Sequence, residues 1–249
     1  MVEQDLSSEQ LRQWTVEALK QELLRLTKHR DTEPLSQKVQ FFKEVLAPVC
    51  QELTTRNPFP NVADQAPLVI GTWIPLWSTI PFQDTIPGRL REQSYQIFHD
   101  DGYYANVARY APGKRLPLLK KLPSFLFAYD FLILQKYQIA DGHWSIQNVA
   151  IEQKLSFGSR PLSPERAESW FTQVAQAKAK AAALKQDSLE TPDFRHLDQK
   201  TAKRYATIFK ATPQLEHLYI DSEFRLVKSQ REAKQRPSYT ITVRMGSAI

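Results

Sequence analysis

Residues 125–157 read FLFAYDFLILQKYQIADGHWSIQNVAIEQKLSF, two long apolar-rich runs that meet at Asp141-Gly142. Asp-Gly between such runs is a strong hairpin signal, because a type I′ turn needs positive φ at both central residues and these two tolerate it. A two-residue loop fixes the register, since directly opposed residues share a face. The expected pairs are Ile139 with Trp144, Tyr137 with Ile146, Gln135 with Asn148, and Ile133 with Ala150.

The two faces of this expected ribbon differ in composition. One face is aromatic with a few amide side chains. The other is aliphatic and comprises Leu126, Ala128, Leu132 and Leu134 against Val149, Ile151, Leu155 and Phe157. Neither is plainly solvent-facing, as one side of an open two-layer sheet would be. This pattern favours a curled sheet or barrel that is hollow inside and has helices laid outside.

The composition is that of a globular protein with one large domain or two small ones: 249 residues, 42% hydrophobic and 24% charged. The single Cys50 excludes a disulfide framework and a cysteine metal site. The sequence contains no run of about 18 apolar residues, and it therefore predicts no transmembrane helix. The acidic start MVEQDLSSEQ is unlike a signal or transit peptide. We therefore expect a protein that stays in the compartment of its synthesis.

The net charge of +6 is concentrated late in the chain, where residues 159–249 hold 16 basic and 10 acidic residues. This bias permits an anionic partner, either a membrane surface or a nucleic acid. Nucleic-acid binding through the basic C-terminal third is the less favoured alternative, because no aromatic-basic consensus such as an RRM strand signature is present.

Two helices are expected before the first strand. A Ser7/Gln10 capping box begins the first, and Asn57-Pro58 ends the second. Apolar residues recur at helical spacing between these limits. We expect residues 1–60 to form a helical lead-in packed on the barrel.

A barrel domain is expected over residues 61–249, with a helical insertion at about 163–210. The insertion begins with a helix at Ser163-Pro164 and continues with a weaker one over Leu197–Lys210. Besides the central hairpin, the expected strands are Leu68–Trp77, Gln93–His99, Tyr103–Tyr110, Leu215–Ile220, Glu223–Lys228 and Tyr239–Met245. The fold class is therefore α+β: an antiparallel β-barrel with two N-terminal helices and one or two helices inserted before the last strands.

Catalytic motifs are absent from the sequence: it has no Gly-rich phosphate loop, HExxH, GxSxG or CxxC. The five histidines are scattered and form no local metal-ligand pair. We therefore predict no catalytic residue, no metal and no cofactor. One enzymatic alternative remains open, a curled-sheet cone acting on a small apolar substrate with Asp130, His99 or Asp221 as the base.

Aromatic residues are dense on the expected strands and are accompanied by isolated polar groups, which is how apolar ligand pockets are usually lined. For each of these aromatic residues, the alternative is a side chain packed in an ordinary β-sheet core. The residues predicted to bind a ligand are Trp77, Tyr95, Tyr104, Phe131, Tyr137, Trp144, Ile146 and Asn148. Among these, Asn148 would orient a carbonyl or hydroxyl group.

A basic segment precedes the central hairpin. Lys114, Arg115, Lys120 and Lys121 alternate with leucines and prolines. Exposed, such a segment suits an anionic lipid surface, with leucines inserted and lysines at the headgroups. The alternative is a covered crossover loop.

Two short motifs carry a resemblance. Asn57-Pro58, followed by Gly71-Thr72-Trp73, resembles the opening motif of the plastid lipid-associated protein (fibrillin) family. Leu218–Leu226 is similar to that family's closing Tyr-Leu-Asp…Leu-Arg-Ile motif. Trp77 stands where a Tyr is usual, and Lys228-Ser229 and their neighbours replace the expected Arg-Gly. Together, the two regions that match the family make up roughly a fifth of the chain.

The resemblance implies a lipocalin-like barrel that binds hydrophobic molecules such as quinones, carotenoids or fatty acids near photosynthetic membranes. It implies no enzymatic activity. The lack of a transit peptide points to a cyanobacterial member, located in the cytoplasm and peripherally bound to the thylakoid or plasma membrane.

By the same analogy, Gly71-x-Trp73 resembles the lipocalin signature, in which a Trp closes the barrel floor beneath an Arg from a late strand. Arg225 is the first candidate for that partner and Arg244 the second, and Asp221 is assigned to the same floor. Stacking of a planar guanidinium on an indole face contributes about 0.5–2 kcal/mol.

Overall fold

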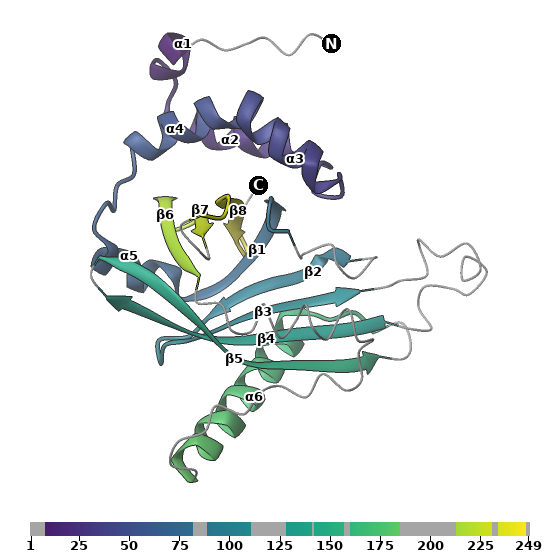
Figure 1. Ribbon diagram of the computed structural model, residues 1–249. Coiled ribbons are helices and arrows are strands. Elements are labelled where there is room, and N and C mark those ends of the chain that lie inside the picture. The colour runs from purple at the N-terminus through teal and green to yellow at the C-terminus, as the bar shows by residue number, and fades with distance from the viewer. Residues whose placement is uncertain are drawn as a thin grey trace, which may run out of the picture.

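Eight antiparallel strands close into a barrel in the computed structural model, which describes residues 8–81, 89–110, 128–140, 142–156, 160–184, 213–230 and 234–247 (Figure 1). Each strand pairs with the next in sequence, and the last pairs with the first. Their bounds are β1 (Gly71–Ser78), β2 (Arg89–Phe98), β3 (Tyr103–Tyr110), β4 (Ala128–Ala140), β5 (His143–Ser156), β6 (Gln214–Ile220), β7 (Phe224–Gln230) and β8 (Ser238–Arg244).

The N-terminal lead-in is helical but more broken than expected. The first expected helix is divided into α1 (Ser8–Arg12) and α2 (Val16–Thr27). Thr15 makes the division, because its side chain accepts a hydrogen bond from the Ala18 N–H and caps α2. The Ser7 side of the expected capping box lies outside the described residues.

The second expected helix is continuous but changes its winding. It consists of α3 (Leu35–Phe41), a π-helical turn η1 (Phe42–Leu46) and α4 (Ala47–Thr55). Pro48 lies just after the π turn, and proline has no N–H to donate to the preceding turn of an α-helix. A local π turn is a common way to accommodate such an interruption.

A further helix, α5 (Val62–Val69), stands where the first strand was expected to begin. The strand prediction was wrong from Leu68 to Ile70, because the pattern changes at Gly71 rather than at Leu68. Gly71 has a φ of +110°, which allows the chain to turn from the helix into β1. In Figure 1, α5 lies at one end of the barrel.

The central hairpin confirms three of the four expected pairs: Ile139 with Trp144, Tyr137 with Ile146, and Gln135 with Asn148. The fourth was wrong, since Ala150 pairs with Leu134 and Ile133 pairs with Ile151. A β-bulge between these two sets of pairs inserts one extra residue, Val149, into β5.

The bulge moves part of β5 to the other face. Ala150 joins Leu132 and Leu134 on the outer face. Ile151 and Leu155 are opposite Ile133 and Tyr129, on the inner face, whereas the sequence had placed both with the aliphatic set. A one-residue slip has this effect because side chains alternate with period two.

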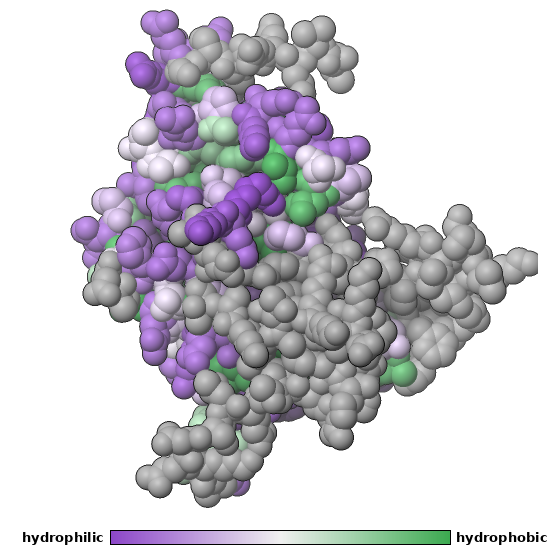
Figure 2. All heavy atoms as spheres, in the orientation of Figure 1, coloured by the Kyte–Doolittle hydropathy of each residue, from purple (hydrophilic) through white to green (hydrophobic). Residues whose placement is uncertain are grey.

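Helices cover two outer faces of the barrel (Figure 1). The N-terminal helices pack on the outer face of β1, β7 and β8, in a cluster that includes Leu19, Leu53, Trp77 and Ile241. Hydrophilic residues dominate the exposed side of these helices (Figure 2). The single inserted helix within the described residues, α6 (Pro164–Leu184), covers β2 to β5 through Trp170 and Phe171. The expected helix at Leu197–Lys210 lies outside the described residues.

Asp31 anchors the lead-in to the barrel. This carboxylate is 2% exposed and accepts a hydrogen bond from the Ser78 N–H of β1 at 3.0 Å. It also forms ion pairs with Arg89 of β2, with Arg91 at 3.3 Å and with Lys38 of α3 at 3.8 Å. These contacts fix the position of the helices on the barrel, because moving them apart would leave buried charges without their oppositely charged partners.

Within the part of the chain that the structure describes, no helix has the length and apolar character needed to cross a bilayer.

Candidate functional site

The inside of the barrel has a closed end built by α5 and Trp73. Trp73 is fully buried, and its indole N–H donates to the carbonyl of Val69 at the end of α5, at 2.7 Å. Val69 and Trp73 form one apolar cluster with Phe98, Trp144 and other inner side chains of the barrel. The helix therefore fills this end from within.

Both arginines proposed from the sequence contact Trp73. The guanidinium carbon of Arg225 lies 4.7 Å from the Trp73 ring centroid, and that of Arg244 lies 4.3 Å away. Arg225 also lies 4.7 Å from the Phe98 ring centroid. Phe98 is itself stacked on Tyr104 at 4.2 Å. The closed end is thus a stack of aromatic rings and guanidinium groups.

Arg244 uses its hydrogen bonds to join the segments at this end. It donates to the carbonyls of Leu68, Ile70 and Ser222, which belong to the end of α5 and to the β6–β7 turn. Gly71 makes the close approach possible, because a Cβ at this position would lie 2.9 Å from the Arg244 Nη1 atom. The glycine is therefore needed for both its φ and its lack of a side chain.

Arg225 is buried, and no anionic side chain of the described residues pairs with it. It is 1% exposed, and its Nε and Nη1 atoms have no hydrogen-bond acceptor among the described residues. Burial lowers the pKa of Arg225 to about 9, against an opposing effect of Tyr104 and with a further lowering from Arg244. The group is still cationic at neutral pH, so the closed end carries a positive charge.

A row of amide side chains crosses the inner face from β2 to β5. Gln96 donates to Asn106 at 3.3 Å, Asn106 donates to Gln135 at 2.8 Å, and Gln135 donates to Asn148 at 2.7 Å. The hydroxyl of Tyr104 also donates to Asn106, at 2.8 Å. The register of the strands aligns these residues, and each amide satisfies the next.

His217 of β6 contributes a neutral imidazole. Its Nδ1 lies 3.1 Å from Gln65 Oε1, which also accepts the Trp144 indole N–H at 3.0 Å. Gln65 donates its own amide N–H to the Phe59 carbonyl, so Oε1 is an acceptor and His217 Nδ1 carries the proton. Burial, together with Arg225, lowers the pKa of His217 well below its usual value. The remaining Nε2 is a buried acceptor.

Three buried acceptor atoms on the inner face lack a partner among the described residues. They are His217 Nε2, Gln96 Oε1 and Thr242 Oγ1. Thr242 lies directly opposite Arg225 in the β7–β8 pair, and Gln96 lies opposite Trp73 in the β1–β2 pair. Buried polar groups in native proteins are usually hydrogen-bonded to protein or to ordered water, so these three atoms are positions where a water molecule or a ligand would be held.

The other end of the inner face is more open. Asn106 of the amide row and its inner-face neighbours Ala108 and Ile133 are only half-buried. Further along, Tyr129 and Leu155 are opposite one another and are 42% and 45% exposed. Burial of the inner face is therefore greatest around Trp73 and lowest at Tyr129 and Leu155, with Phe131, 5% exposed, between them.

Six of the eight residues predicted to bind a ligand lie on this inner face: Tyr104, Phe131, Tyr137, Trp144, Ile146 and Asn148. They do not have the same surroundings. Trp144 and Ile146 pack in the α5 cluster at the closed end. Phe131 lies toward the open end, edge-on to Tyr110 at 5.8 Å.

The structure places Trp77 and Tyr95 on the outer face instead. A bulge between Pro75 and Trp77 reverses the alternation of β1, so Trp77 packs against the N-terminal helices and stacks on Phe42. Tyr95 packs under α6, and its hydroxyl donates to the Leu162 carbonyl at 3.0 Å. Neither residue reaches the interior.

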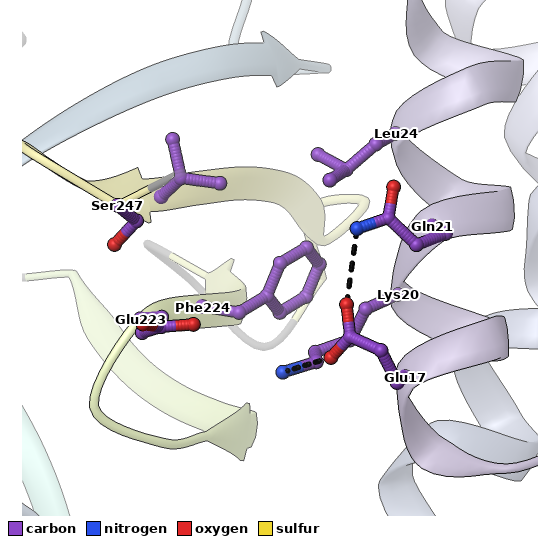
Figure 3. A pocket seen from close by; sticks show the side chains of 8 residues that line it. Glu17, Lys20, Gln21, Leu24, Glu223, Phe224 and Ser247 are labelled. Atoms are coloured by element: carbon purple, nitrogen blue, oxygen red, sulfur yellow. Dashed lines mark hydrogen bonds and ion pairs between the residues drawn. The ribbon is translucent and has the colours of Figure 1, made fainter. Parts of the chain in front are cut away.

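Asp221 also differs from its expected place in the floor, because it lies in the β6–β7 turn and faces the lead-in. It accepts hydrogen bonds from the backbone N–H groups of Glu223 and Phe224, from the Tyr219 hydroxyl and from Lys20 of α2. A small pocket lies beside this contact, between α2 and the ends of β7 and β8, where Phe224 points toward the helix (Figure 3). This pocket is on the outside of the barrel.

The three candidate bases of the enzymatic alternative are held in three different places. Asp130 pairs with Arg109 at 2.6 Å on the outer face. His99 lies against Glu168 of α6, and Asp221 pairs with Lys20 at 2.9 Å. Each is occupied by a different partner. In the described ranges, no group of three or more His, Cys, Asp or Glu side chains could hold a metal ion.

The predicted membrane residues Lys114, Arg115, Lys120 and Lys121 lie outside the described residues.

Several inner residues were missed by the sequence analysis: Gln65, Gln96, Asn106, His217 and Thr242. A helix-start signal was available for Gln65, since Asn61 is followed three positions later by Asp64, and the two side chains are 3.3 Å apart. The others lie on strands as single polar residues, and no local pattern distinguishes an inner polar residue from an exposed one.

Comparisons with protein-family models, with curated proteins and with solved structures find no match for this chain.

Proposed function

We propose that this protein binds a hydrophobic small molecule, such as a lipid, an isoprenoid quinone or a carotenoid, inside the barrel and catalyses no reaction on it. One observation carries the proposal. An aromatic inner face, closed at the Trp73 end and half-exposed at the other, contains buried polar atoms with no partner within the described residues. Apolar walls with a few convergent polar groups are typical of small-molecule sites.

The direct test is to identify what co-purifies with the protein. Native mass spectrometry of the intact protein, followed by organic extraction and analysis of the extract, is expected to reveal a stoichiometric apolar compound. A protein that carries no such compound and binds none of the three ligand classes in titrations would contradict the proposal.

A site-directed test uses the half-exposed part of the inner face. Replacing Ile133 with Trp adds bulk to the interior between the amide row and the open end. We expect weaker binding of a fluorescent lipid probe without loss of folding. The matched control is Ile139→Trp on the same strand, where the side chain is 37% exposed. Unchanged binding by Ile133→Trp would place the ligand elsewhere.

The resemblance to the plastid lipid-associated protein family supports the same proposal. Its Gly71-x-Trp73 and Arg225 positions lie together at the closed end of an eight-stranded barrel. We therefore propose a lipocalin-like, cyanobacterial-type member of that family that acts near photosynthetic membranes. Fold similarity by itself does not identify a ligand, so the extraction experiment is needed to name it.

Peripheral membrane contact is the second part of this proposal. Each basic residue near an anionic bilayer contributes about 1 kcal/mol before salt screening. Replacing Lys114, Arg115, Lys120 and Lys121 together with Gln is expected to abolish sedimentation with anionic liposomes and to leave the response to neutral liposomes unchanged. Full sedimentation of this variant with anionic liposomes would move the membrane surface to another part of the chain.

A further inference from the structure

The charge balance at the closed end of the barrel is incomplete. Arg225 is 1% exposed, and none of the ion pairs formed by the described residues includes it. Its neighbours across the strands, Ile220 and Thr242, are both neutral. The rings of Trp73 and Phe98 compensate part of the cost of desolvation, but they provide no anion.

The other polar groups nearby cannot supply the missing charge. His217 is neutral, because burial and Arg225 itself lower its pKa. The hydroxyl of Tyr104 is also neutral, since burial raises its pKa to about 12. A second cation, Arg244, lies on the same Trp73 ring. The closed end is therefore an electropositive site in an apolar setting, where charge interactions are strong.

We propose that the ligand is an amphiphile whose carboxylate pairs with Arg225, while its apolar chain extends along β3, β4 and β5 toward the half-exposed end. This inference rests on the proposed function and narrows its ligand to a long-chain monocarboxylic acid. A carboxylate accepts charge-assisted hydrogen bonds from the free guanidinium N–H groups, and the Thr242 hydroxyl is placed to donate another.

The dimensions of the inner face suit such a chain. Gln135 in the amide row and Tyr129 at the open end are six positions apart on β4, which is a span of roughly 20 Å at 3.3 Å per residue. The inner residues between them are Phe131 and Ile133, which face Gln153 and Ile151 of β5. An acyl chain would thus have mostly apolar neighbours along its length.

The experiment compares two ligands that share a chain and differ at the head. Purified full-length protein, freed of endogenous lipid, is titrated with oleate and with oleyl alcohol at pH 8 by isothermal titration calorimetry. We expect oleate to bind at least about tenfold more tightly, because only oleate supplies the anion. Arg225→Met keeps an apolar side chain of similar length, and it should lose this preference while still binding the alcohol.

Two controls accompany the comparison. Arg236→Met makes the same substitution at an exposed arginine between β7 and β8, and it should leave the preference intact. Thr242→Val tests the site without removing the cation, and it should weaken oleate binding several-fold with no effect on the alcohol. If Arg225→Met does not fold, Thr242→Val still tests whether the carboxylate binds at this site.

The outcomes separate this inference from the proposed function. Equal affinity of the wild-type protein for oleate and oleyl alcohol, or a preference for oleate that survives in Arg225→Met, would overturn the carboxylate assignment and leave apolar-ligand binding intact. Failure of the wild-type protein to bind either ligand would overturn the assignment together with binding of lipid-like ligands.

Discussion

Arg225 lies over the Trp73 ring with its guanidinium carbon 4.7 Å from the ring centroid, and yet two of its nitrogen atoms have no partner within the described chain. Arg244 contacts the same ring, but it donates to three backbone carbonyls. The two arginines that the sequence offered as alternatives for one structural role therefore have different surroundings. Arg244 ties the closed end together, and Arg225 faces the interior with free donors.

Replacements at Arg225 separate its packing from its charge. Arg225→Ala removes the side chain from between Trp73 and Phe98 and should lower the free energy of unfolding by about 1–3 kcal/mol. Arg225→Met preserves apolar packing and removes an unpaired buried charge, so it should be at least as stable as the wild type. Urea unfolding in the absence of ligand measures both. A wild-type stability for Arg225→Ala would rule out a structural contribution.

Gly71 is expected to be intolerant of a side chain. In Gly71→Ala the new Cβ would meet Arg244 Nη1 at 2.9 Å in a residue with a φ of +110°, and we expect a loss of about 2–4 kcal/mol from clash and strain together. Gly142→Ala is the matched control, because its φ is +73° and nothing lies within 4 Å of the new Cβ. Strain alone should cost that variant about 1–2 kcal/mol. Thermal unfolding that ranks the two variants in the opposite order would contradict this account.

The amide row should respond strongly to the loss of one member. Gln135→Leu removes the acceptor of the Asn106 amide N–H and the donor to Asn148 Oδ1, and a buried donor left unsatisfied costs about 1–3 kcal/mol. Gln138→Leu on the same strand changes an exposed side chain and should stay within about 0.5 kcal/mol of the wild type. Chemical denaturation of both variants tests the difference. Similar stabilities would mean that water replaces the missing amide.

Stability should fall as the pH is lowered below about 6.5, because His217 is neutral in the folded protein. Burial, together with Arg225, lowers its pKa well below the ordinary value of 6.5, so the unfolded chain binds more protons between the two pKa values. Above pH 6.5 the histidine is neutral in both states and does not lower the stability. As the pH falls toward the folded-state pKa, the free energy of unfolding decreases by up to about 1.4 kcal/mol per pH unit. Melting curves from pH 8 to pH 5 measure this slope.

The matching variant is His217→Asn, which keeps a donor for Gln65 and cannot titrate. It should show a shallower pH dependence than the wild type, whereas His143→Asn, at an exposed histidine, should not. Equal slopes in all three proteins would assign the pH dependence to other groups.

Removal of the Asp31 charge should loosen the lead-in from the barrel. Asp31→Asn removes the buried carboxylate charge that pairs with Arg89 and Lys38. Breaking a buried ion pair from one side costs about 3–5 kcal/mol. The control is Asp64→Asn, at an exposed carboxylate on α5. Limited proteolysis should cut residues 8–55 faster in Asp31→Asn, and resistance equal to that of the wild type would show that apolar packing alone holds the helices.

Local sequence determined most of the secondary structure of this protein. Asp141-Gly142 set the central hairpin and its first three pairs, because the turn needs positive φ and the apolar runs on either side extend the ladder. Apolar residues at helical spacing indicated the lead-in, and Ser163-Pro164 marked the start of α6. These signals act over a few residues, and they can therefore be read without knowing what lies across the fold.

Only the tertiary structure decided which side chains face the interior. Bulges at Leu76 and Val149 change the face of every residue beyond them on their strands, and this is why Trp77 lies outside the barrel and Ile151 inside it. The unpaired charge of Arg225 was equally hidden, because pairing depends on groups from strands far apart in the chain. Pro75 indicates an interruption of the β1 ladder, because proline has no N–H to donate, but nothing in the sequence marks the bulge at Val149. The inner face could therefore be assigned only once the barrel had closed.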